Sequence, residues 1–144
     1  MNKILLKSIF IFLFAGSVFS YAQAEQKIKT QQQNRVEVYY FHGNFRCPTC
    51  FKIEQYSREA VESNFKDELG SGKITFRAVN IEEKGNEHFV NDYQLYTRSL
   101  IISLVKDGKE TKYSNLTKVW EHIRNKEIFF EYVKKEITNY LKEL

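Results

Sequence analysis

The strongest constraint on the fold lies in residues 36–50, where a hydrophobic run leads through a polar turn to the only two cysteines of the chain. Residues 36–41 are mostly β-branched or aromatic, which fits a largely buried strand. From residue 51 to 69, apolar side chains recur every three or four positions, which indicates one buried face of a helix. The segment therefore predicts a strand that delivers Cys47 and Cys50 to the first turn of a helix.

The residues around the cysteines predict where that helix begins. His42-Gly43-Asn44 is expected to form the turn, because Gly and Asn tolerate the left-handed backbone of a sharp reversal. Pro48 has no N–H and a fixed φ, so it suits the first turn of a helix and no later position. We therefore expect Cys47 at or beside the helix N-terminus.

This placement favours thiol chemistry. Unpaired backbone N–H groups and the helix dipole stabilise an anion, so the pKa of Cys47 should fall from about 8.5 to between ~3.5 and ~7.5. Arg46 should lower the same pKa. Cys50, one turn further on, should be shielded, which suits a thiol that attacks only after Cys47 has formed a mixed disulfide. A purely structural disulfide is the less favoured alternative, since so short a loop constrains the unfolded chain weakly.

The N-terminus has the pattern of a bacterial-type signal peptide. Residues 1–24 combine Lys3 and Lys7, a short apolar core and a small-x-small cleavage site at residues 22–24. This predicts a periplasmic or secreted protein that contacts a membrane only through this segment, if it stays uncleaved as an anchor. Residues 25–35 are polar and predict a flexible tether, so the folded domain is expected at residues 36–144.

The charge balance disfavours nucleic acid as a partner. Lys3 and Lys7 account for two of the 22 basic residues, so removing residues 1–24 leaves 20 basic against 18 acidic residues. The two signs are interleaved along the chain, as expected for a solvated surface and not for a phosphate-binding stripe. The length fits one domain with one core.

The rest of the chain predicts an α/β fold in the order β-α-β-α-β-β-α around a central mixed four-stranded sheet. A strand-helix-strand unit should place its two strands parallel. Beyond the cysteine helix we expect a strand at 73–79, a short helix within 82–96, a buried strand at 100–105, a tight turn at 106–109, an edge strand at 110–113 and helices within 116–144 that break at Asn125.

The element order and the Cys-x-x-Cys motif together resemble the thioredoxin fold. The resemblance implies thiol-disulfide exchange without a cofactor, with Cys47 as nucleophile, Cys50 as resolving thiol and Pro48-Thr49 between them. It also implies protein or small-molecule disulfides or dithiols as substrates, and a redox partner protein that recycles the dithiol. More narrowly, HGNFRCPTCFKIE is similar to exported thioredoxin-like proteins described as nitrophenyl-compound nitroreductase subunits of the arsenic-operon type.

Two positions depart from the thioredoxin pattern. Thioredoxins usually have a cis-proline before the third strand, whereas this chain has Ser99 or a neighbour there. We expect a trans peptide at this position, because a non-proline cis bond costs roughly 2.5 to 4 kcal/mol. The buried acid that assists the resolving cysteine of thioredoxin maps to Phe41 or His42.

Two other functions remain open. Cys47 and Cys50 could carry a soft metal or arsenite, with His42 as a further ligand, because two sulfurs alone leave a zinc site incomplete. His42 is nevertheless favoured as a turn residue. The chain could also be a non-catalytic interaction domain. His88, His122 and Trp120 are interpreted as surface or packing residues, with Trp120 expected in the core; Lys52 and Glu54 could contact a partner or simply face solvent.

Overall fold

The computed structural model describes residues 34–144. The predicted signal peptide at 1–24 lies outside these residues, as does most of the predicted tether. The first strand, β1, begins at Arg35, so the last residue assigned to the tether belongs to the sheet.

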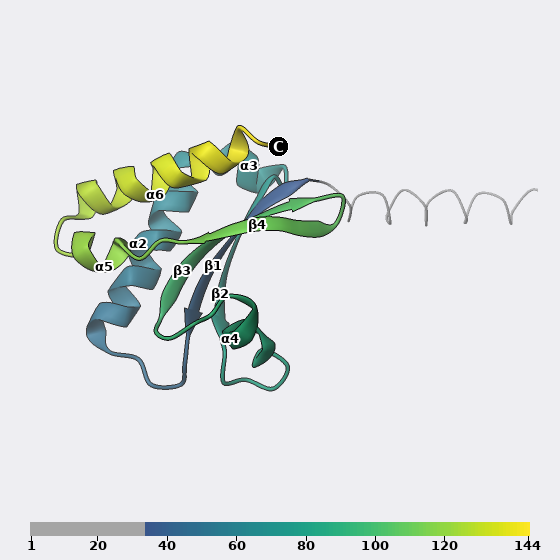
Figure 1. The fold of residues 1–144 in the computed structure, drawn as a ribbon. Coiled ribbons are helices and arrows are strands. Elements are labelled where there is room, and N and C mark those ends of the chain that lie inside the picture. The colour runs from purple at the N-terminus through teal and green to yellow at the C-terminus, as the bar shows by residue number, and fades with distance from the viewer. Residues whose placement is uncertain (1–33) are drawn as a thin grey trace, which may run out of the picture. The chain divides into compact units, whose positions relative to one another are not determined.

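A four-stranded mixed sheet in the order β2-β1-β3-β4 forms the centre of the molecule (Figure 1). The central strand β1 (Arg35–His42) runs parallel to β2 (Ile74–Asn80) and antiparallel to β3 (Ser99–Lys106). The edge strand β4 (Lys109–Asn115) pairs antiparallel with β3. This order and connectivity confirm the predicted α/β thioredoxin-like fold.

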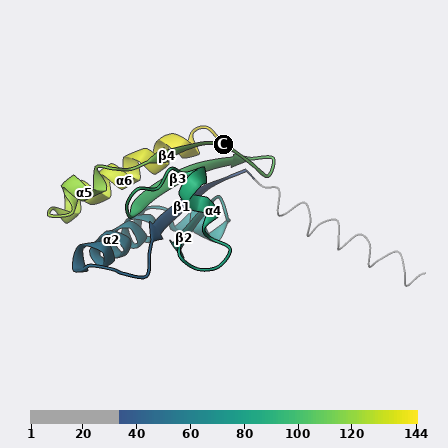
Figure 2. The ribbon, with the colours of Figure 1, turned by 60° about the horizontal axis from the view of Figure 1, so that its bottom comes forward.

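Helices cover the two faces of the sheet unequally. The long helices α2 (Pro48–Asn64) and α6 (Lys126–Leu141) pack on one face, and the five-residue helix α4 (His88–Asp92) lies on the other (Figures 1 and 2). Two short helices, α3 (Lys66–Gly70) and α5 (Val119–His122), precede β2 and α6. Within residues 34–144 no helix is both long and apolar enough to cross a membrane.

The central strand supplies side chains to a core on each face. Val36, Val38 and Tyr40 point to the side of α2 and α6, while Tyr39 and Phe41 point to the side of α4. Successive side chains of a strand face opposite ways, so a strand covered on both sides is apolar throughout. This is why the sequence of β1 shows a continuous hydrophobic run and no alternation.

Two of the expected helices are shorter than the sequence suggested. The region 82–96 is helical only at α4, because turns occupy the residues before it and Gly85 has a φ of 97°. The stretch 116–123 is helical only at α5. The predicted break is confirmed: the side chain of Asn125 accepts a hydrogen bond from the Ile128 N–H and so caps α6.

Candidate functional site

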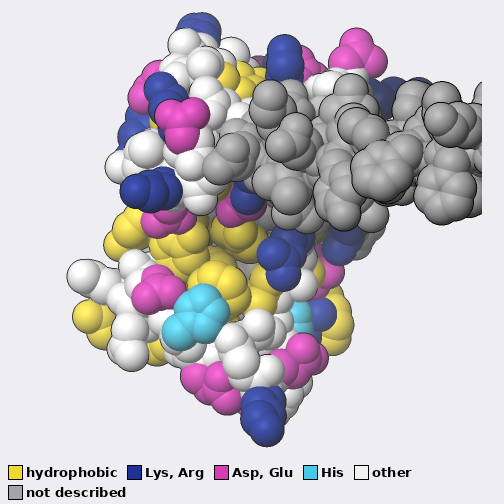
Figure 3. All heavy atoms as spheres, turned by 90° about the vertical axis from the view of Figure 1, so that its right-hand side faces the viewer, with side chains coloured by type: hydrophobic (Ala, Val, Ile, Leu, Met, Phe, Trp, Pro, Cys, Tyr) yellow, Lys and Arg dark blue, Asp and Glu magenta, His cyan; other side chains and the backbone are white. Residues whose placement is uncertain are grey.

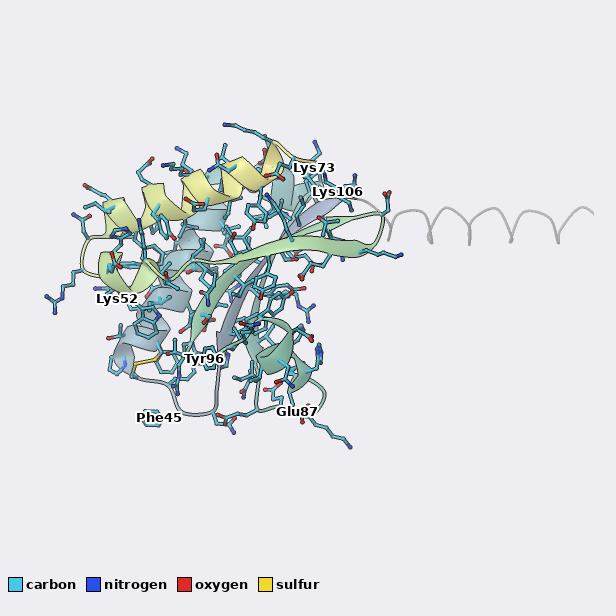
Figure 4. The ribbon with its side chains drawn as sticks, viewed as in Figure 1. Phe45, Lys52, Lys73, Glu87, Tyr96 and Lys106 are labelled. Atoms are coloured by element: carbon cyan, nitrogen blue, oxygen red, sulfur yellow. A yellow bond between two sulfur atoms is a disulfide. The ribbon has the colours of Figure 1, made fainter. Side chains whose placement is uncertain are left out.

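The two cysteines form a disulfide at the N-terminus of α2 (Figure 4). Cys47 is the N-cap residue, with φ −81° and ψ 163°, and Pro48 is the first residue of the helix. The Sγ atom of Cys47 accepts a hydrogen bond from the backbone N–H of Cys50 at 3.2 Å. This sulfur therefore lies where the unpaired N–H groups of the helix can stabilise a thiolate after reduction.

The two sulfurs differ in accessibility. Cys50 is buried, with an exposed fraction of 3%, whereas Cys47 is half-buried and followed by the exposed Pro48 and Thr49. The hydroxyl group of Tyr40 donates a hydrogen bond to the carbonyl oxygen of Cys50 at 2.7 Å, which fixes the first turn of α2 to the central strand. A molecule in solution can therefore reach Cys47 but not Cys50.

Arg46 adjoins the disulfide, but its charge is balanced by a neighbour. Its guanidinium forms an ion pair with Glu54 and stacks on the ring of Phe51, 4.1 Å from the ring centroid. Arg58 also approaches the carboxylate of Glu54, at 3.4 Å. Because Glu54 offsets part of its charge, Arg46 stabilises a Cys47 thiolate less than its position in the sequence suggested.

A second arginine near the disulfide was not found from the sequence. Arg98 precedes β3, and its Nη2 atom donates a hydrogen bond to the carbonyl oxygen of Phe45 at 2.6 Å. The indole N–H of Trp120 donates to the carbonyl oxygen of Arg98 at 3.2 Å. These two bonds tie the loop before Cys47 to the start of β3 and to α5. No ion pair within residues 34–144 involves Arg98.

Ser99 is one of the residues expected at or beside the position at which thioredoxins usually carry proline. It is the first residue of β3, and its buried hydroxyl group donates to the carbonyl oxygen of Thr97 at 2.9 Å. The side chain of Asn115 lies 3.4 Å from the same hydroxyl oxygen. All peptide bonds between residues 34 and 144 are trans, which confirms the expected trans peptide here.

The turn before the disulfide is built differently from the prediction. Gly43 and Asn44 do not have positive φ angles, so the left-handed backbone expected there was wrong. A Cβ atom at position 43 would clash with Oε1 of Glu82, so a larger residue here would displace that carboxylate. Oε2 of Glu82 accepts a hydrogen bond from the backbone N–H of Asn44 at 3.0 Å, and Asn80 donates to the side chain of Asn44 at 2.8 Å.

The histidines are not assembled into a metal site in the part of the chain that the structure describes. There, no three His, Cys, Asp or Glu side chains are placed to share a metal ion. His42 was predicted as a turn residue, but it is the last residue of β1, paired with Asn80, and its Nδ1 lies 3.0 Å from the carbonyl oxygen of Gly43. His88 pairs with Asp92 on α4, and His122 packs edge-on against Tyr132.

Exposed aromatic side chains occur in the segments around the disulfide. Trp120 was expected in the core, but 36% of it is exposed, because α5 is only four residues long and turns this side chain outward. Phe45, Phe51 and Tyr96 are more exposed still, at 76%, 54% and 94%. In Figure 4, Phe45 and Tyr96 lie at the same end of the molecule as the yellow disulfide bond.

A small cavity lies beside the loop that carries Cys47. Its volume is about 110 Å³, and residues from β1, the turn after β2 and the segment before β3 form its walls. The lining residues are Phe41, His42, Gly43, Ile81, Glu82, Leu95, Tyr96, Thr97 and Arg98.

No family model matches this chain, and no curated protein matches it in sequence. Two solved thioredoxins are similar in structure. Thioredoxin O2 from Arabidopsis thaliana in the oxidized state is 16% identical over 74% of this chain and 88% of its own, with a TM-score of 0.42. Fasciola hepatica thioredoxin is 25% identical over 72% of this chain and 91% of its own, with a TM-score of 0.40. The fold assignment rests on the strand order and connectivity of the sheet.

Proposed function

We propose that this protein is a thiol-disulfide oxidoreductase in which Cys47 is the nucleophile and Cys50 the resolving thiol. The observation that carries the proposal is the position of the disulfide: one sulfur is accessible at the N-cap of α2, and the other is buried one turn later. A staple that only stabilised the fold would gain little from so short a loop.

The geometry supports the two half-reactions. In the reduced protein the Cys50 N–H and the dipole of α2 stabilise the Cys47 thiolate; a pKa lowered by ~1.5 units corresponds to roughly 2 kcal/mol. This thiolate attacks a substrate disulfide, forms a mixed disulfide and releases one thiolate. Cys50 then attacks Sγ of Cys47, which releases the second thiol and reforms the protein disulfide.

The proposal also covers the compartment, the substrates and the partner of the protein. The pattern of residues 1–24 supports export to the periplasm or secretion. Substrates would be protein or small-molecule disulfides or dithiols, and a partner protein would recycle the dithiol. Membership of the arsenic-operon type of thioredoxin-like protein rests on the HGNFRCPTCFKIE segment.

Equilibration of the purified protein in graded thiol-disulfide buffers, followed by trapping of free thiols, tests the function. We expect one two-electron transition between the values of about −270 mV for a reductant and about −120 mV for an oxidant. Cys50→Ser should accumulate a mixed disulfide on Cys47, and Cys47→Ser should form none. If no reversible transition appears, the protein is not an oxidoreductase, and a metal carrier or a non-catalytic domain takes its place.

A further inference from the structure

The cavity beside the Cys47 loop contains two opposite charges that are not paired with each other. Arg98 and Glu82 both line it, yet none of the ion pairs within residues 34–144 joins them. An empty space with a guanidinium and a carboxylate in its walls fits a ligand that carries both signs. Such a ligand could satisfy both side chains at once.

Arg98 has donors to spare. Its guanidinium has five N–H groups, and the bond from Nη2 to the Phe45 carbonyl uses one of them. The buried Nε atom has no hydrogen-bond partner. That atom is enclosed by protein and cannot meet a ligand, but Nη1 has no partner among residues 34–144 and is not fully buried, so it can donate to an acceptor on a ligand. A carboxylate matches the planar fork of the guanidinium best.

Glu82 faces the same space from the turn after β2. Oε2 is used by the Asn44 N–H, while Oε1 accepts no hydrogen bond from residues 34–144. Gly43 lacks a side chain, which lets the carboxylate lie against the backbone of the Cys47 loop. One oxygen of this exposed carboxylate is bonded to the Asn44 N–H, and the other can accept a bond from an ammonium group.

The size of the cavity and its place in the fold limit the ligand. A volume of about 110 Å³ is well above the ~10–15 Å³ that one water molecule needs, and it suits a small group such as an amino-acid head group and not a folded peptide segment. Arg98 is bonded to Phe45, two residues before Cys47. Tyr96, another lining residue, lies at the disulfide end of the molecule in Figure 4.

We propose that this cavity binds the α-amino-carboxylate group of a small disulfide such as cystine, with the carboxylate on Arg98 and the ammonium group on Glu82. This inference rests on the proposed oxidoreductase function and names its substrate class. The Cys47 thiolate attacks one sulfur of the bound disulfide, forms a mixed disulfide and expels one thiolate. Cys50 then forms the protein disulfide and releases the second thiol, so two electrons pass from the protein to the substrate.

Four small disulfides separate the contributions of the two charges. Cystine carries both charged groups, cystamine only ammonium groups, 3,3′-dithiodipropionate only carboxylates, and 2-hydroxyethyl disulfide neither. The prereduced protein is mixed with each in turn, and the loss of free thiols is followed by rapid trapping. Dividing each rate by the rate of the same disulfide with dithiothreitol removes differences in intrinsic reactivity.

We expect the normalised rate for cystine to exceed each of the other three by about tenfold, the equivalent of 1.4 kcal/mol. Arg98→Met should remove the advantage of carboxylate-bearing substrates, and Arg98→Lys should keep part of it. Glu82→Gln retains an oxygen that can accept the Asn44 bond, and should remove only the advantage of ammonium-bearing substrates. Arg124→Met, on an exposed residue after α5, is the matched control and should leave the order of the four substrates unchanged.

Equal normalised rates for cystine and 2-hydroxyethyl disulfide would overturn the inference while leaving the oxidoreductase function intact. A preference for cystine that survives both Arg98→Met and Glu82→Gln would also overturn it, because the selectivity would then arise elsewhere. If none of the four disulfides oxidises the dithiol, the inference fails, and the absence of a reversible transition in the graded thiol-disulfide buffers would show that the proposed function fails as well. The comparison of substrates on the unaltered protein needs no variant, so a folding defect in one variant does not remove the test.

Discussion

The two faces of the sheet bury cores of different size and composition. The face under α2 and α6 buries a large, mainly aliphatic core, which includes Phe129 at its centre. The face under α4 is covered by five helical residues and buries a smaller cluster in which aromatic rings such as Tyr39, Phe41 and Tyr93 contact each other. Figure 3 looks at the side on which α4 lies and shows hydrophobic side chains gathered in one patch among charged ones.

The disulfide and the cavity lie on different faces of the sheet. The dithiol helix, α2, lies on the face that α2 and α6 cover, which we call the thick face, and there Cys50 is buried and held through Tyr40. The cavity lined by Arg98 and Glu82 adjoins the face under α4, which we call the thin face. Phe41 and Leu95 belong both to the walls of this cavity and to the buried aromatic cluster under α4. The disulfide is thus held by a deep core, while the neighbouring surface can change with less loss of stability.

The strongest test of this contrast is a pair of phenylalanine deletions. Phe129→Ala on α6 removes a fully buried ring and should lower the free energy of unfolding by about 4 kcal/mol. Phe89→Ala on α4 removes a half-buried ring and should cost about half as much. Urea unfolding monitored by circular dichroism measures both. Equal losses would show that the two faces contribute equally and would break the comparison.

A second test concerns the bond that holds the dithiol helix to β1. Tyr40→Phe removes the hydrogen bond to the Cys50 carbonyl and should cost about 1 kcal/mol at pH 7. Burial raises the pKa of Tyr40 from 10.0 to about 12. The unfolded chain therefore loses this proton before the folded protein does, so the stability from Tyr40 is complete below pH 10 and declines between pH 10 and 12.

Urea unfolding at pH 7 and at pH 11 measures this dependence. The deficit of Tyr40→Phe relative to the unaltered protein should shrink as the pH rises through this window. A deficit that stays constant between the two pH values would contradict the assignment of the raised pKa to Tyr40.

A third test addresses the polar support of the thin face. The carboxylate of Glu110 accepts hydrogen bonds from the hydroxyl groups of Ser103 and Tyr93, and so links β4 to the segment after α4. Glu110→Gln should lower the free energy of unfolding by about 1 kcal/mol. Burial and then the bond to Glu110 raise the pKa of Tyr93, so the variant should lower it. Ultraviolet titration of the tyrosines checks this, with Glu143→Gln, on an exposed ion pair with Lys112, as the control.

The smallest expected effect is at the contact between α5 and the start of β3. Trp120→Phe removes only the indole N–H bond to the Arg98 carbonyl, and the side chain is already 36% exposed. We expect a loss of about 0.5 kcal/mol in urea unfolding, at the low end for one hydrogen bond. A loss as large as that of Tyr40→Phe would show that the contact between α5 and the start of β3 stabilises the fold as much as the bond between Tyr40 and the dithiol helix.

The sequence predicted the thick face and the dithiol well, because their signals are local. The hydrophobic run of β1, the proline at the helix start and the helical spacing after Cys50 all lie within about 35 consecutive residues. The hairpin between β3 and β4 was equally clear: Asp107 and Gly108 adopt the positive φ angles, 51° and 75°, that such a tight turn requires.

The other walls of the site could not be read from the sequence. Arg98 meets Phe45 across 53 positions, and Glu82 meets Asn44 across 38, so neither contact has a local pattern. Trp120 was misplaced because its apolar spacing suggested a longer helix than α5. The unusual residues at 97–99, where a proline was expected, were the one signal that could have drawn attention to Arg98.

The bond between Trp120 and the Arg98 carbonyl also gives the protein an optical property. Trp120 is the only tryptophan of the chain, so light absorbed near 295 nm excites essentially one side chain. Its indole N–H is bonded to the same residue that ties down the loop before Cys47. The emission of the unlabelled protein therefore comes from one indole, which lies against the segment that holds the loop before Cys47.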